Sequence, residues 1–286
     1  AGTLPHRFPA MAGKGSVAGR YLKNAVLAVI ASCLAIVVAS ALLTQREVHT
    51  HTLAYRLVPD QGQAEADALR TAVALISRRA ATLGKSLGVR DCTVSAEPQG
   101  RLKLSFRAHP DAAEALLWLT MPGRVELHLV HPDQDILSAT PPGELPAGYE
   151  VRCYQEQLYQ LSRPGALATR EHRYLVCTEP AMRVSRFKQV RLDTAGLYKT
   201  TVLTFAFEEG ERERFRDLTA LNVGRHMVML VDGTLFFPSS QIQSAIEGGV
   251  VQVQGYFYNP PLRKLVGVLN ASPLPGRLEE LSHLIE

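Results

Sequence analysis

A run of 19 residues without a charged side chain, residues 25–43, constrains this chain more than any other feature. As an α-helix it would be roughly 28 Å long, close to the about 30 Å hydrocarbon core of a bilayer. Four basic residues and no acidic residue precede it. The positive-inside rule therefore predicts a cytoplasmic tail over residues 1–23, a transmembrane helix over residues 24–44 and an extracytoplasmic domain after it.

A cleaved signal peptide is the alternative interpretation of the same run. Ala39-Ser40-Ala41 has the small-x-small pattern of a cleavage site and lies at the end of the apolar segment. Both interpretations export the rest of the chain. The anchored form predicts a single-pass protein of the inner membrane, which contacts lipid through residues 24–44 and has its C-terminal domain in the periplasm.

The net charge of +4 does not indicate a nucleic-acid-binding surface. The four basic residues before the apolar run account for it, because the remaining 27 Lys and Arg residues equal the 27 Asp and Glu residues in number. A surface that follows a phosphate backbone has a local excess of Lys and Arg, so this neutral domain has no such support.

Three cysteines, Cys92, Cys153 and Cys177, follow the apolar run and would lie in an oxidising compartment. Cys153 and Cys177 flank a polar, turn-rich segment and are candidates for a disulfide. The alternative is three isolated, buried thiols. No C-x-x-C spacing indicates a metal site.

The first half of the exported part predicts a ferredoxin-like base subdomain over residues 50–131. Alternating apolar residues indicate strands, and apolar residues spaced by three and four indicate helices. The segments, in order, are strand 52–58, helix 63–87, strands 92–96 and 102–106 around a Gly turn, helix 112–119 and strand 125–129. This order is that of the split βαβ unit, a four-stranded sheet with both helices on one face.

The second half predicts a connection over residues 132–170, with one strand near 149–154, and a head subdomain over residues 171–275. A strand or tail over residues 276–286 follows. The head segments are strands 174–177, 187–192, 200–207, 226–231, 234–237 and 250–256, a helix from Glu208 to Leu221, and a last helix that begins at Asn259. The fold class is therefore α+β.

No motif in the sequence indicates an enzyme. Gly84-Lys85-Ser86 lies inside an amphipathic helix, and the first glycine of a phosphate-binding loop is missing. The acidic residues 208–213 suit a solvated first helical turn. Asp232 precedes Gly233 between two apolar runs, and hairpin turn chemistry explains it without catalysis. No cofactor or small-molecule substrate is predicted.

Two pairs of histidines lie close together in the sequence, one at 128 and 131 and one at 49 and 51. His128 and His131 lie on or just after a strand, and His128 shares its predicted polar face with Glu126. Without a third ligand, a solvated strand face is the better interpretation. His49 and His51 follow the apolar run and are interpreted as polar residues next to the membrane.

Four stretches, residues 215–233, 237–249, 253–257 and 269–275, together resemble the SecD and SecDF protein-export family. The shared pattern is a helix ending in Thr-x-x-Asn-x-Gly, a strand leading into Asp-Gly, a proline, Gly-Gly, a strand of the type Gly-x-Phe, and a helix leading to Leu-Pro. In that family this stretch is the head of the first periplasmic (P1) domain. A weaker likeness covers the base and the apolar run.

The resemblance implies a list of motif residues with a structural or polypeptide-binding role. They are Phe215, Leu218, Thr219, Asn222, Gly224, Asp232, Gly233, Pro238, Gly248, Gly249, Gly255 and Phe257. It also implies the Sec translocon and exported polypeptides as partners, and a head that swings against its base.

Departures from the family pattern bear on the function. The family continues into further membrane helices with proton-coupling residues, and no second apolar run is present here. Phe237-Pro238 replaces Ala-Pro, and Pro260-Pro261 replaces acidic residues. The expectation is an anchored module that assists export by binding emerging polypeptide. The alternative is a structural or assembly protein of the cell envelope that uses the same fold against one fixed partner.

Overall fold

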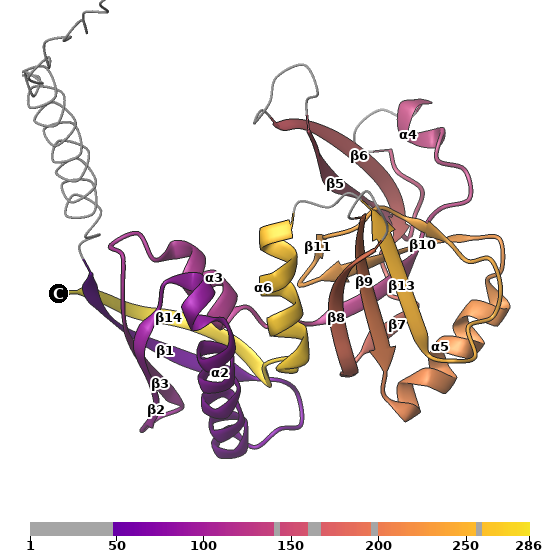
Figure 1. Cartoon of the computed structure of the whole chain (residues 1–286). Helices are drawn as coiled ribbons and strands as arrows, with labels where there is room; N and C mark the ends of the chain where they lie inside the picture. The colour runs from indigo at the N-terminus through magenta and orange to yellow at the C-terminus, as the bar shows by residue number, and fades with distance from the viewer. Residues whose placement is uncertain (1–47, 140–143, 160–166, 196–199, 256–258) are drawn as a thin grey trace, which may run out of the picture. The chain divides into compact units, whose positions relative to one another are not determined.

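The computed structural model describes residues 48–139, 144–159, 167–195, 200–255 and 259–286 (Figure 1). The predicted transmembrane helix over residues 24–44 lies outside these residues. Among the helices that are described, none is long and apolar enough to cross a membrane. Residues 48–286 form one compact unit, which contains both the base and the head.

The base is a four-stranded antiparallel sheet covered by two helices. Its main helix forms where the sequence spaces apolar residues by three and four, and Ala72 and Ile76 on that stripe are completely buried. The helix ends at Gly88, whose φ of +69° favours a residue without a Cβ. The N-terminal elements are β1 (His49–Pro59), α2 (Glu65–Leu87), β2 (Arg90–Glu97), β3 (Arg101–Ala108) and α3 (Ala113–Thr120).

The fourth strand of the base comes from the far end of the chain. The sheet order is β14-β1-β3-β2, where β14 is Gly276–Ile285, and β14 lies antiparallel beside β1 (Figure 1). The arrangement is the predicted split βαβ unit, but the prediction took residues 125–129 as its last strand. That assignment is wrong, because β4 (Val125–Leu129) pairs with β10 (His226–Val231) and β7 (Met182–Val184) in the head. Alternation identified a strand but not its sheet.

The head contains the middle of the chain. Its sheets are β11-β10-β4-β7, with β12 also paired to β10, then β13-β9-β8, and the hairpin β5-β6. Their bounds are β5 (Tyr149–Tyr159), β6 (Leu167–Cys177), β7 (Met182–Val184), β8 (Phe187–Ala195), β9 (Thr200–Phe207), β10 (His226–Val231), β11 (Thr234–Leu235), β12 (Ser240–Gln241) and β13 (Val250–Gly255). Its helices are α4 (Ile136–Ala139), α5 (Glu209–Leu221) and α6 (Asn259–Asn270).

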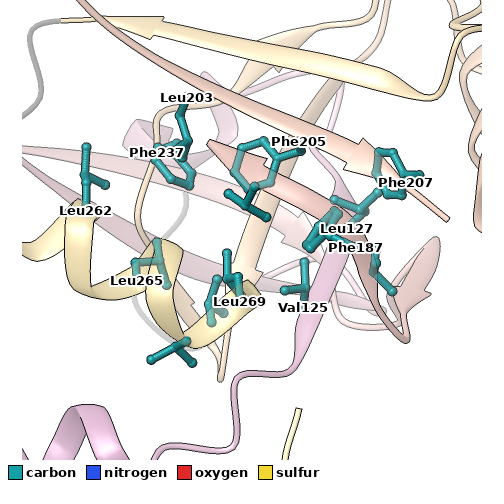
Figure 2. Close-up of a cluster of buried hydrophobic side chains, with 14 of the residues drawn as sticks. Val125, Leu127, Phe187, Leu203, Phe205, Phe207, Phe237, Leu262, Leu265 and Leu269 are labelled. Atoms are coloured by element: carbon teal, nitrogen blue, oxygen red, sulfur yellow. The ribbon is translucent and has the colours of Figure 1, made fainter. Parts of the chain in front are cut away.

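Aromatic side chains fill the centre of the head. Phe205 and Phe237 meet edge to face with ring centroids 6.0 Å apart, and Phe187 lies 5.3 Å from Phe205. The apolar face of α6 turns Leu262, Leu265 and Leu269 toward this cluster (Figure 2). Full burial of one such side chain stabilises a fold by about 1.5–3 kcal/mol. This core therefore fixes α6 against the head.

Two segments connect the subdomains. The chain leaves the base between α3 and β4 and returns between α6 and β14. Helices α2 and α6 approach so closely that a Cβ at Gly267 would collide with the side chain of Leu83. The predicted base of residues 50–131 is therefore corrected to residues 49–120 together with β14.

The segment predicted as a connection, residues 132–170, contains most of a long hairpin. Strand β5 pairs with β6 over eleven positions, with Tyr149 opposite Cys177 and Cys153 opposite Arg173. The two cysteines are thus four positions apart along the ladder, roughly 14 Å at 3.4 Å per residue. Both are free thiols, so the candidate disulfide is corrected; the alternative of three buried thiols also fails, because Cys153 is exposed.

Candidate functional site

The motif residues Phe215 and Thr219 lie on the face of α5 that packs against the core of the head. Phe215 is buried and stacks on Phe207 with ring centroids 4.5 Å apart. Thr219 is completely buried, and its hydroxyl donates to the carbonyl of Phe215 at 2.9 Å. The same oxygen accepts the Ile246 N–H at 3.0 Å. Thr219, in the interior of α5, thus connects the helix to the loop before β13.

The helix end and the next turn depend on Asn222 and Gly224. The Asn222 amide donates to the Leu218 carbonyl at 2.8 Å, which satisfies one of the free carbonyls at a helix C-terminus. Gly224 has φ +86°, and its N–H donates to the Ile242 carbonyl at 2.8 Å. Asn222 and Gly224 therefore form the turn that leads into β10, and Gly224 connects this turn to the loop after β12 by a hydrogen bond.

Asp232 lies in the hairpin turn that the sequence predicts, with φ +48°. Its two carboxylate oxygens accept the N–H groups of Gly123 at 2.8 Å and Arg124 at 2.9 Å. Gly233 has φ +76°, and its carbonyl accepts Nη1 of Arg152 at 3.2 Å. Asp232 thus connects the β10–β11 turn to the segment that enters β4, in addition to its role in the turn.

The remaining motif residues stand around β13. Gly249 has φ +59°, and a Cβ there would collide with the side chain of Arg212. Its carbonyl accepts the N–H of Phe207 at 2.8 Å, which starts the β9–β13 ladder. The preceding residue, Gly248, is exposed, and Pro238 is half-buried. Gly255 is the last residue of β13, and Phe257 lies outside the described residues. These motif residues build caps and turns, and the described ones bring no reactive groups together.

Arg79 is a functional candidate that the sequence analysis missed. It is completely buried in α2, and its guanidinium donates to four backbone carbonyls, one at the end of α3 and three in the two segments that connect base and head. The acceptors are Leu119 (3.3 Å), Met121, Pro122 (3.2 Å) and Ser272 (3.0 Å). Burial lowers the pKa of Arg79 to about 10, against the opposite effect of Asp232. Its position three residues after Ile76, on the apolar stripe, was the available signal.

A pocket of about 310 Å³ opens on the head beside the Asn222–Gly224 turn. Val130, Pro132 and Tyr174 supply an apolar wall, while His131, Arg225 and His226 supply polar groups. The Arg225 guanidinium donates to the Asn222 side-chain oxygen at 3.1 Å, and within the described residues no carboxylate pairs with it. The pocket therefore combines apolar surface with a cation that is not neutralised locally.

The prediction for His128 is wrong. His128 is buried, 2% exposed, rather than on a solvated strand face, and its Nδ1–H donates to the Cys177 carbonyl at 2.7 Å. Both edges of this strand are paired, with β10 and with β7, and the end of β6 at Cys177 contacts the His128 ring on its face of the sheet. His131 lies edge-on to Tyr149, with ring centroids 4.6 Å apart. Across the described part of the chain, no group of three or more His, Cys, Asp or Glu side chains could hold a metal ion.

His51 is also buried rather than a polar residue next to the membrane. Its ring stacks on Phe106, with centroids 5.2 Å apart. Nε2–H donates to the His109 carbonyl at 3.0 Å, so Nδ1 accepts the His283 Nε2–H, also at 3.0 Å. Burial lowers the pKa of His51, and the charges of His283 and His49 act in the same direction. This pair joins β1 to β14.

The comparisons with known proteins agree with the described geometry. Residues 156–276 match the family described as SecDF, P1 head subdomain. The match begins within β5 and includes β6, so it extends into the segment predicted as a connection. Over 78 residues the chain is 35% identical to the protein translocase subunit SecD of Acidaminococcus fermentans. That alignment covers 27% of this chain and 18% of the relative.

Two solved structures share the fold at 16% sequence identity. The crystal structure of SecDF in a super-membrane-facing form has a TM-score of 0.55, over 83% of this chain and 30% of that chain. The second, described as a membrane component SecDF that enhances protein export, has a TM-score of 0.54, over 81% of this chain and 98% of that chain. These likenesses support an α+β fold of the P1 type.

Proposed function

The chain belongs to the SecD/SecDF P1 domain family, and on this premise we propose that it assists protein export by binding emerging polypeptide outside the cytoplasm. It does so as an anchored module, held to lipid of the inner membrane by residues 24–44. The Sec translocon and exported chains are its partners in this proposal.

The pocket beside Tyr174 is the observation that carries the proposal. Its apolar wall suits a large side chain, and Arg225 adds attraction for a nearby carboxylate. An unfolded chain presents both kinds of group, whereas a folded protein buries most of its large apolar side chains. A site of this composition therefore favours unfolded over folded polypeptide without demanding one sequence.

Binding of one protein in two states tests the proposal. The full chain, purified in nanodiscs, is presented with reduced, carboxymethylated α-lactalbumin and with the native protein, and binding is followed by biolayer interferometry. We expect binding of the unfolded form only. Tyr174→Ala should weaken it about fivefold or more, because the large aromatic wall of the pocket is lost. Leu117→Ala is the control, since Leu117 is an exposed apolar residue of α3 in the base.

Equal binding of both forms, or of neither, would contradict the proposal. A second experiment addresses the alternative function. Crosslinking in the native host, followed by affinity purification and mass spectrometry, should recover translocon subunits with diverse exported proteins. Recovery of one stoichiometric envelope partner without the translocon would instead support the structural or assembly function.

A further inference from the structure

Strand β13 is the outer strand of the three-stranded sheet β13-β9-β8. Its residue pairs with β9 run from Val250 opposite Ala206 to Gly255 opposite Thr201. The N–H of Phe207 bonds the Gly249 carbonyl, and hydrogen-bonded pairs alternate with non-bonded pairs in an antiparallel ladder. The backbone N–H and C=O groups of Val250, Gln252 and Gln254 therefore point away from β9.

These outward groups are open to solvent. The side chains of Val250, Gln252 and Gln254 are exposed, while Val251 and Val253 pack on the head core. Among the residues that the structure describes, no backbone or side-chain group hydrogen-bonds to the outer backbone groups of this strand. Three residues thus leave three donors and three acceptors free along one edge.

The other edge of the same sheet is closed. At β8 the side-chain amide of Asn270 accepts the Val190 N–H at 2.8 Å and donates to the Val190 carbonyl at 2.9 Å. This two-point contact replaces the ladder that an added strand would form. Charged side chains at Lys188 and Arg191 lie on the same strand. The protein therefore blocks pairing at one edge of this sheet and leaves it open at the other.

Every other long edge strand that is described has charge or irregular pairing. Proteins use charges, proline, bulges and short strands to prevent edge-to-edge association. Strand β7 has three residues and β11 two; charges on the longer edge strands include Arg90 and Glu97 on β2, Glu150 and Arg152 on β5, and Arg277 and Glu279 on β14. Strand β13, Val-Val-Gln-Val-Gln-Gly, has neither a charge nor a proline.

We propose that the outer edge of β13 receives an extended polypeptide segment by β-strand addition. The incoming strand would satisfy the free groups of Val250, Gln252 and Gln254. Its side chains opposite Val251 and Val253 would extend the apolar face of the sheet, and the alternate ones would face water. The preferred segment is therefore uncharged, with alternating apolar and polar residues. This inference rests on the proposed function and names the backbone contact that it uses.

Gln252→Pro tests the edge directly. Proline removes the outward N–H of residue 252, and no bond of the β9 ladder is lost. The ligand is a fluorescein-labelled ten-residue peptide of alternating threonine and valine, and its dissociation constant for the full chain in nanodiscs is measured by fluorescence polarisation. We expect Gln252→Pro to raise the constant at least tenfold and Gln252→Lys several-fold. Hydrogen exchange over residues 250–254 should slow when the peptide binds the unaltered chain.

Thr204→Lys is the matched control. Thr204 lies opposite Gln252 on the central strand β9, so the same charge is added to the same face but not at the edge. The dissociation constant should stay within twofold, and the circular dichroism spectrum of each variant should match that of the unaltered chain.

Three outcomes would overturn the inference. If Gln252→Pro binds the peptide normally while Tyr174→Ala does not, polypeptide binding stands and the edge is not its site. If neither the peptide nor unfolded α-lactalbumin binds, the proposed function fails as well. If the chain dimerises and Gln252→Pro abolishes the dimer, the occupant of the edge is a second copy of the chain.

Discussion

The base and the head close their cores over very different distances along the chain. In the base, the buried Arg79 contacts Ser272, which is 193 residues away. Inside the head, the buried hydroxyl of Thr219 contacts Ile246, 27 residues away, and the carboxylate of Glu211 accepts the Ser185 N–H over 26 residues. Other polar contacts of the head reach further, up to 109 residues between Asp232 and Gly123, but the main anchor of the base spans the whole head.

This difference predicts how each subdomain responds to damage. The base sheet is complete only when β14 returns beside β1, after the whole head has been made. Contacts between distant residues require the closure of long loops, which costs conformational entropy. Arg79 holds both connecting segments at that junction, so its loss should affect the whole molecule, whereas a fault in a head turn should remain smaller.

The largest effect is expected for Arg79→Met. Methionine keeps part of the apolar stem but leaves buried carbonyls without their donors. We expect the free energy of unfolding to fall by about 3–4 kcal/mol, because hydrogen bonds to a buried charge are stronger than neutral ones. Urea denaturation of the full chain, followed by the fluorescence of the single Trp118, measures it.

Arg78→Met supplies the control for this prediction. Arg78 is the preceding residue of the same helix and is exposed, so its replacement should change stability by less than about 0.5 kcal/mol. Equal effects of the two substitutions would mean that the carbonyl contacts of Arg79 contribute little, and the contrast between base and head would lose its main support.

The same contrast explains which parts of the structure the sequence predicted. Turns and helix caps depend on residue types at a few adjacent positions. The sequence therefore predicts the Asp232-Gly233 hairpin and the helix that ends near Asn222 correctly. Alternation also located the strand at residues 125–129. Periodicity carries no information about which sheet a strand joins, however, and residues 276–286 predict only a strand or tail without a partner strand.

Burial of polar residues was the other feature that the sequence did not disclose. His51 and His128 have polar neighbours in the sequence, and each was interpreted as exposed. Their partners, His283 and the Cys177 carbonyl, come from strands that only the tertiary fold brings near. The open edge of β13 likewise depends on the order of strands in the sheet, which the sequence does not predict. The absence of charged residues from this strand is visible in the sequence itself.

A smaller effect is expected in the head for Gly249→Ala. The residue has φ +59°, and an added Cβ would meet Cγ, Cδ and Cβ of Arg212, the last of which cannot move far. We expect a loss of about 1–2 kcal/mol in the free energy of unfolding. Gly248→Ala is the matched control, because nothing lies within 4 Å of its Cβ position. A loss at Gly249 as large as that of Arg79→Met would remove the predicted difference between the subdomains.

The smallest effect is a pH dependence in the base that the head should not share. Burial lowers the pKa of His51 below its ordinary value of 6.5, so between 6.5 and that lowered pKa the unfolded chain binds a proton that the folded chain does not. Stability from this group is therefore complete above pH 6.5 and decreases as the pH falls, by at most about 1.4 kcal/mol per unit. His51→Phe keeps a ring over Phe106 and should reduce the loss between pH 7.5 and 5.5 by roughly 1 kcal/mol. Replacement of the exposed His226 by Gln is the control. If His51→Phe leaves the slope of unfolding free energy against pH unchanged, the buried histidine pair does not make the β1–β14 junction sensitive to acid.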